Sequence, residues 1–214
     1  MSTQTPTADQ TRAPLRRATA WLLSTAVAAV AVATVTTISQ VLERFHWWAG
    51  FVLLPGALIA AAGGPWLLRG GARAVGGYVV TCVGALVFTV GTLLMLGAMG
   101  DGWPIMISLP AAFVAGTYLW RPEHPLLRGL HRTVAMLALL TVLLGFTFLV
   151  LRAGWFYPRS GWWGAFMMAA GLIVAGNGVE VARHRMPYRL SAATLAFGPA
   201  VLTFLLGLRF LRGW

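Results

Sequence analysis

The chain has 214 residues, of which 58% are hydrophobic and 10% charged, whereas roughly a quarter of a soluble domain is charged. The formal net charge is +11, and all sixteen basic residues are arginines. These arginines lie between long apolar runs, which argues against a nucleic-acid-binding surface and indicates a membrane protein in contact with anionic lipid headgroups. Without lysine there is no retinal-type Schiff base, and the single cysteine, Cys82, excludes an intrachain disulfide.

The N-terminal residues differ in character from the rest of the chain. Residues 1–19 are polar, contain prolines and end in an arginine cluster, so we expect a disordered cytoplasmic tail. Residues 20–214 are expected to form one transmembrane domain. The apolar run 21–42 follows the arginines as in a signal peptide, but it exceeds the usual signal length of about 7–15 apolar residues. We therefore predict that it is retained as the first span.

Seven apolar stretches meet or approach the roughly 20 residues that a helix needs to cross a bilayer. Tryptophan or tyrosine marks many of their ends, as expected at the headgroup level. The predicted spans are residues 21–42, 47–68, 74–99, 103–120, 133–151, 162–181 and 190–211. The predicted fold class is therefore all-α, a polytopic membrane bundle of seven transmembrane helices. Six spans are the alternative, because 103–120 is short and contains Pro104 and Pro110.

The distribution of arginines predicts the orientation, because cytoplasmic loops carry an excess of basic residues. With the N-terminus inside, the cytoplasmic segments hold eleven arginines and the outer segments hold five. The inner set is Arg12, Arg16, Arg17, Arg69, Arg73, Arg121, Arg128, Arg132, Arg183, Arg185 and Arg189, and the outer set is Arg44, Arg152, Arg159, Arg209 and Arg212. We therefore predict an N-in, C-out topology in the cytoplasmic membrane, and the arginine- and alanine-rich composition favours a bacterium.

Two spans carry glycines at seven-residue spacing, a pattern that keeps small residues on one helix face. The seams are Gly77, Gly84 and Gly91 in the third span and Gly164, Gly171 and Gly178 in the sixth. Both are expected to pack closely against other helices. Because these two spans run in opposite directions, an antiparallel pairing of the two seams is one hypothesis.

A polar face occurs near the end of the sixth span. Asn177, Glu180 and His184 are three and four residues apart and share one side of the helix, nearly opposite the glycine seam. Facing lipid would be costly, so this span is expected to be central in the bundle. We hypothesise that Glu180 acts as an acid or base, and that Asn177, Arg183 and His184 contact a substrate. The alternative is an interfacial carboxylate paired with Arg183 or Arg185.

No cofactor or metal site is predicted from the sequence. The four-residue spacing of Glu180 and His184 permits a shared divalent metal, with a third ligand from Glu123, His124 or His131, but spacing alone is a weak signal.

A second polar cluster is expected on the outer side. Gln40 and Glu43 follow helical spacing at the end of the first span, and Asp101 follows the third span. Glu43 and Asp101 are candidate catalytic carboxylates and Gln40 a candidate substrate contact. The alternative is a solvated loop in which Arg44 balances Glu43.

Three functions agree with these features. The favoured one is a membrane-embedded enzyme that acts on a lipid-like or isoprenoid substrate through interfacial carboxylates, with nearby arginines holding an anionic group. The second is an accessory or assembly subunit whose glycine seams pack partner helices. The third is a small-molecule transporter that uses helix breaks at Pro55, Pro110 and Pro199, although no ionisable residue lies at mid-membrane depth.

Overall fold

The computed structural model describes residues 8–120, 122–123, 125–155, 159–183 and 189–213. In this part of the chain all regular structure is helical. The α-helices are α1 (Ala8–Val41), α2 (Gly50–Leu67), α3 (Gly71–Met95), α4 (Met99–Gly116), α5 (Pro125–Arg152), α6 (Gly164–Arg183) and α7 (Arg189–Arg212). Short 3₁₀ helices, η1 (Trp47–Ala49) and η2 (Thr117–Leu119), precede α2 and follow α4.

The described residues contain seven helices that are long and apolar enough to cross a membrane. Their candidate spans agree with the predicted ones to within a few residues at most ends, and the short fourth span is among them, as Met99–Leu119. The prediction of an all-α, seven-helix membrane fold is confirmed. The protein is therefore an integral, multi-pass membrane protein.

The first helix begins earlier than the sequence suggested. We expected a disordered tail through residue 19, yet α1 is already helical at Ala8, while its apolar span begins at Ala18. Residues 8–19 include alanine, leucine and arginine, which favour helix. Extending an existing helix costs less free energy than nucleating a new one. The helix that forms the membrane span therefore continues into the polar residues before it.

The helices carry large apolar side chains on their outer surfaces. Leu58 is 67% exposed, Leu143 is 51% exposed and Leu195 is 76% exposed. Exposed large hydrophobic side chains occur on all seven helices, and so much exposed apolar surface is rare on a soluble monomer. In a bilayer the same side chains contact lipid tails, so helix association depends on close packing rather than on burial from water.

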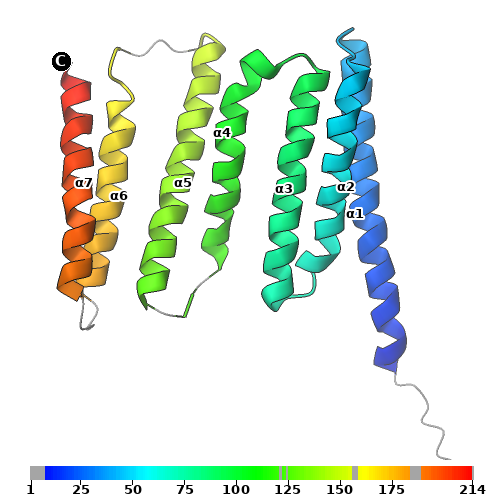
Figure 1. Ribbon diagram of the computed structural model, residues 1–214, viewed down its shortest axis with the longest axis horizontal. Coiled ribbons are helices and arrows are strands. Elements are labelled where there is room, and N and C mark those ends of the chain that lie inside the picture. The colour runs from blue at the N-terminus through cyan, green and yellow to red at the C-terminus, as the bar shows by residue number, and fades with distance from the viewer. Residues whose placement is uncertain (1–7, 121, 124, 156–158, 184–188, 214) are drawn as a thin grey trace, which may run out of the picture. The chain divides into compact units, whose positions relative to one another are not determined.

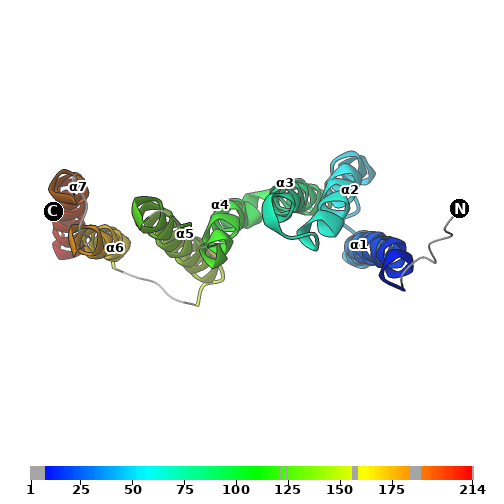
Figure 2. The ribbon, with the colours of Figure 1, turned by 90° about the horizontal axis from the view of Figure 1, so that it is seen from below.

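The chain divides into two compact units, residues 1–102 and 103–214. In the first unit α2 and α3 lie side by side (Figures 1 and 2), and the Gly77–Gly84–Gly91 seam of α3 faces α2. A Cβ added at Gly77 would lie 2.6 Å from the Leu67 nitrogen, and one at Gly84 would overlap the Ala60 backbone. The seam thus lets two helix backbones approach more closely than any larger residue would allow.

The first unit has a small packed cluster where α2 begins and α3 ends. Ala49, Leu53 and Met95 form this cluster and are almost completely buried. Nearby, Nδ1 of His46 lies 2.8 Å from the Arg44 carbonyl and 3.1 Å from the Met95 carbonyl. Since both partners are acceptors, Nδ1 carries the hydrogen, and this contact ties the loop after α1 to the end of α3.

In the second unit the Gly164–Gly171–Gly178 seam of α6 faces α7, its neighbour in sequence. A Cβ at Gly171 would lie 2.7 Å from the Ala200 carbonyl oxygen, and one at Gly178 would lie 3.1 Å from the Ala196 side chain. The α3 seam is filled by α2 and the α6 seam by α7, so the hypothesis that the two seams pair with each other is wrong. Each seam is thus filled by a helix that is adjacent in the sequence.

The opposite face of α6 packs against α5, so α6 lies between two helices of its unit (Figure 1). Three successive levels join them. Gly129 lies against Val181, Arg132 pairs with Glu180, and Met136 contacts Asn177; these contacts are one helical turn apart along α5. The polar face of α6 therefore faces protein rather than lipid, in agreement with the cost of exposing it to hydrocarbon.

Candidate functional site

A polar pocket of about 360 Å³ lies in the second unit, where η2, the start of α5 and the end of α6 meet. These elements end at the boundary of the apolar spans, so the pocket is at the level where a lipid headgroup would lie. Its lining residues are Tyr118, Trp120, Pro122, Arg128, His131, Arg132 and Glu180. Of the candidate catalytic and substrate-binding residues chosen from the sequence, only Glu180 is among them; His131, named there as a possible third metal ligand, also lines the pocket.

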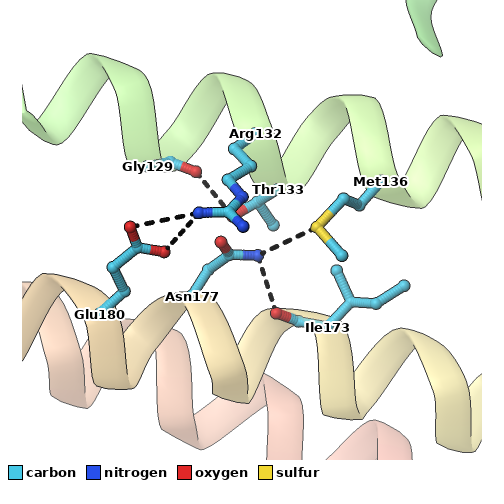
Figure 3. Close-up of polar contacts among 7 residues, drawn as sticks. All are labelled: Gly129, Arg132, Thr133, Met136, Ile173, Asn177 and Glu180. Carbon is cyan, nitrogen blue, oxygen red and sulfur yellow. Dashed lines mark hydrogen bonds and ion pairs between the residues drawn. The ribbon is translucent and has the colours of Figure 1, made fainter. Parts of the chain in front are cut away.

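Glu180 is held by an arginine from the adjacent helix (Figure 3). Nη1 of Arg132 lies 3.0 Å from Oε2 and 3.3 Å from Oε1 of Glu180. We expected Arg183 or Arg185 as the alternative partner; the structure pairs Glu180 with Arg132 instead. A carboxylate in the last turn of a helix opposes the negative end of the helix dipole. Arg132 compensates for this and fixes the rotation of α6 against α5.

Asn177 has a packing role rather than a place in the pocket wall. Its side chain is only 8% exposed, and Nδ2 donates to the Ile173 carbonyl at 2.9 Å. The same nitrogen points across to the Met136 sulfur on α5, at 4.0 Å (Figure 3). The amide satisfies its donor within the helix interface, as a buried polar group must. A substrate contact by Asn177 was expected, but the side chain lies about one turn deeper than Glu180.

Arg128 shapes the loop that closes the pocket. Its Nε donates to the Pro122 carbonyl at 3.0 Å and its Nη2 to the Glu123 carbonyl at 3.4 Å. These acceptors are neutral, and no ion pair involves Arg128 among the described residues, so its remaining N–H groups can bind an anionic ligand. Arg128 and Arg132 are four residues apart and share one face of α5.

His131 lies between these two arginines in the sequence and contributes a ring to the pocket. The Thr117 hydroxyl donates to the Val114 carbonyl at 2.6 Å, so its oxygen accepts the hydrogen bond from Nε2 of His131 at 3.1 Å. Nε2 therefore carries a hydrogen. Tyr118 and Trp120 add amphipathic rings of the kind found at membrane boundaries.

The other substrate contacts predicted near Glu180 are not part of the pocket. Arg183 is exposed at the end of α6 and does not line it, and His184 lies outside the residues that the structure describes. The metal alternative paired Glu180 with His184 and took its third ligand from Glu123, His124 or His131; of these residues His184 and His124 lie outside the described ranges. Within the described ranges no group of three histidine, cysteine or acidic residues could hold a metal ion.

The second predicted cluster belongs to the first unit. Gln40, Glu43 and Asp101 are all exposed. Glu43 has a left-handed backbone (φ 54°) where the chain leaves α1, and Asp101 lies in the first turn of α4. A carboxylate in a first turn is stabilised by the positive end of the helix dipole. That gives Asp101 a structural role, and catalysis by Glu43 or Asp101 stays a prediction.

No known protein family, characterised protein or solved structure matches this chain. Function therefore has to be inferred from the pocket itself. Two arginines, a histidine and two aromatic rings surround one carboxylate at the end of a membrane-spanning unit. Arginine N–H groups recognise phosphate and carboxylate oxygens, and a paired carboxylate can exchange protons once its partner is engaged elsewhere.

Sequence reasoning identified Glu180 but missed Arg128, Arg132, Tyr118 and Trp120 as parts of one pocket. A signal was present, since Arg128, His131 and Arg132 have helical spacing at the same end of the membrane as Glu180. What the sequence lacks is the rotation of α5 about its axis, which decides whether these residues face α6 or lipid.

Proposed function

We propose that the protein is a membrane-embedded enzyme that acts on a lipid-like or isoprenoid substrate with an anionic head group. The observation that supports this is the polar pocket, in which Arg128 and Arg132 converge beside Glu180 at the end of a membrane-spanning unit. The apolar part of such a substrate stays among lipid tails while its head enters the pocket. Amphipathic substrates reach an intramembrane enzyme in this way without leaving the bilayer.

Each polar residue has a role in this proposal. Arg128, which has no ion-pair partner among the described residues, binds the anionic group first. The substrate anion then competes with Glu180 for Arg132, because both bind the same guanidinium. Glu180, released from its ion pair, serves as the proton acceptor or donor. His131, fixed by Thr117, presents its other ring nitrogen as a second proton carrier.

The proposal places the pocket on the cytoplasmic side. This follows from the N-in, C-out topology that the arginine distribution favours, with eleven arginines on the inner side against five on the outer. In a bacterial cytoplasmic membrane, that side is also where anionic headgroups attract basic segments.

The two alternative functions receive less support. The subunit hypothesis required free glycine seams, but α2 and α7 already fill them. The transporter hypothesis uses helix breaks at Pro55, Pro110 and Pro199, and α2, α4 and α7 are each continuous through these prolines. Neither hypothesis uses the polar pocket.

The test compares the lipids of cells that lack the chain with those of cells rescued by wild type, Glu180→Gln or Glu43→Gln. Mass spectrometry of lipid extracts, at matched amounts of folded protein, is the measurement. We expect an amphiphile with an anionic head to accumulate without the chain and with Glu180→Gln, while wild type and Glu43→Gln restore the normal profile. Restoration by Glu180→Gln would refute the proposal, and failure of Glu43→Gln alone would move the chemistry to the other cluster.

A further inference from the structure

The first unit contains a second cavity with the opposite character, an apolar groove of about 440 Å³ between α1, α2 and α3. Alanines and leucines form most of its wall, and Ser24 and Thr81 supply its hydroxyls. The lining residues are Ala20, Leu23, Ser24, Val27, Ala28, Ala31, Ala57, Ala60, Ala61, Gly64, Leu67, Leu68, Thr81, Ala85 and Phe88. This size lies in the range of ligand pockets, about 300–1,000 Å³.

The groove has the length of one membrane leaflet. Along α1 it extends from Ala20 to Ala31, which is about 16 Å at 1.5 Å per residue, or about half of a hydrocarbon core of roughly 30 Å. It opens at a span boundary, because Ala20 lies two residues inside the start of the α1 span at Ala18 and Leu68 directly follows the end of α2. A molecule in it therefore enters from one headgroup layer and ends near the bilayer centre.

The length of the groove suits a hydrocarbon chain better than a helix. A transmembrane helix of a partner protein crosses both leaflets, about 30 Å of hydrocarbon, whereas the groove ends after about 16 Å along α1. Its almost entirely apolar wall therefore fits one acyl chain of a lipid.

Charge at the groove mouth indicates what the chain carries. Arg69 directly follows the groove residue Leu68, and Arg73 lies in the first turn of α3; both are exposed. Two of the unit's acidic residues, Glu43 and Asp101, are at the other end of these helices, beyond the end of α1 and after α3. The third, Asp9, is at the start of α1, where three arginines, Arg12, Arg16 and Arg17, outnumber it. The charge at the mouth therefore complements an anionic head group.

One polar atom in the wall still lacks a partner. The Thr81 hydroxyl oxygen is buried without a hydrogen-bond partner among the described residues. It faces Gly63, four residues, or about 6 Å, inside Leu67 along α2. That is the depth at which the ester carbonyls of a phospholipid follow its head group, and such a carbonyl would accept a hydrogen bond from this hydroxyl after a rotation about χ1.

We infer that this groove is a binding site for one anionic phospholipid, separate from the pocket at Glu180. One acyl chain lies along α1 between Ala20 and Ala31, and the phosphate lies at Arg69 and Arg73. The bound lipid covers the weakly buried face of α1, of whose span only 6% is buried within the protein, and so joins α1 to the α2–α3 pair.

The test uses the full chain in nanodiscs of equal parts phosphatidylglycerol and phosphatidylcholine, followed by native mass spectrometry of the released protein. Wild type is expected to retain one phosphatidylglycerol per chain. Ala28→Phe fills the groove and should reduce this retention by tenfold or more, whereas the matched control Ala29→Phe, on the exposed side of α1, should not. The double variant Arg69→Gln with Arg73→Gln should lower the retention of phosphatidylglycerol relative to phosphatidylcholine by on the order of tenfold. Arg44→Gln should leave this ratio unchanged.

Each other outcome would overturn the inference. Wild-type retention in Ala28→Phe would show that the lipid lies elsewhere, and equal retention of both lipids by wild type would remove the head-group assignment. A change of oligomeric state in Ala28→Phe without a change in lipid retention would place a second copy in the groove. Should Ala28→Phe fail to fold, the surface arginine pair still tests the site.

Discussion

Glu180 occupies a position where a carboxylate by itself is destabilising, and Arg132 is the residue that compensates for it. The Arg132 side chain is 44% exposed and the Glu180 side chain 47% exposed. Water therefore screens their attraction, and the ion pair contributes about 1 kcal/mol or less to stability. The two partners are nevertheless not equivalent. The helix dipole destabilises an unpaired Glu180 at the end of α6 but does not destabilise an unpaired Arg132.

This asymmetry gives a prediction for thermal unfolding in detergent. Arg132→Gln leaves Glu180 unpaired at a helix end and should lower the unfolding temperature more than Glu180→Gln does. The double variant should be no less stable than Arg132→Gln, with a coupling of about 0.5–1 kcal/mol. Glu43→Gln is the control for removing a charge elsewhere. Equal effects of both single changes, with no coupling, would show that the ion pair does not orient α6.

Among the helices, two pairs depend on glycines that admit a neighbouring backbone. Gly84 lies directly against Ala60, and Gly171 lies against Ala200 and Phe204. Van der Waals contact at such seams is the main association energy available in lipid, so a single methyl group at one of these positions must push two helices apart.

We predict that Gly84→Ala and Gly171→Ala each destabilise the protein by about 1–3 kcal/mol through overpacking. Matched controls lie on the same helices. A Cβ added at Gly76 would have no neighbouring atom closer than 3.9 Å, and one added at Gly176 would have none within 4 Å. Alanine at either position should therefore be neutral or slightly stabilising, because alanine favours helix. Unfolding temperatures of the four variants in one detergent measure the difference. Similar losses in Gly76→Ala and Gly84→Ala would contradict the role of the seam.

The sequence predicted which glycines allow close packing, but it did not predict their partners. The seven-residue spacing places Gly77, Gly84 and Gly91 on one face whatever that face meets. Any helix with small or flat side chains can fill such a seam, so its period does not identify the partner. The short connection between α2 and α3 decides the matter, because it holds α2 within reach of α3 during folding.

At the scale of the whole chain, the spans could be predicted because the bilayer imposes a length and a polarity that are visible in the sequence. The pocket could be predicted only in part. Arg132 and Glu180 are 48 residues apart, and their meeting depends on how α5 and α6 rotate about their axes. In α6 the glycine seam and the opposite polar face predict that rotation, whereas the long apolar run of α5 does not define which of its sides faces α6.

The topology is the last property of the whole molecule that an experiment can decide. Seven spans require the two ends to lie on opposite sides, and the arginine excess favours the N-terminal side as cytoplasmic. The only native cysteine, Cys82, lies within α3, so a Cys82→Ala background allows single cysteines to be introduced by Ser2→Cys or Gly213→Cys. A membrane-impermeant maleimide added to intact cells should label Gly213→Cys, and should label Ser2→Cys only after permeabilisation. Labelling of both positions in intact cells, or of neither, would mean an even number of crossings. Exchange of the two patterns would reverse the orientation and place the Glu180 pocket outside the cell, because the pocket follows the end of α6 whichever way the chain is inserted.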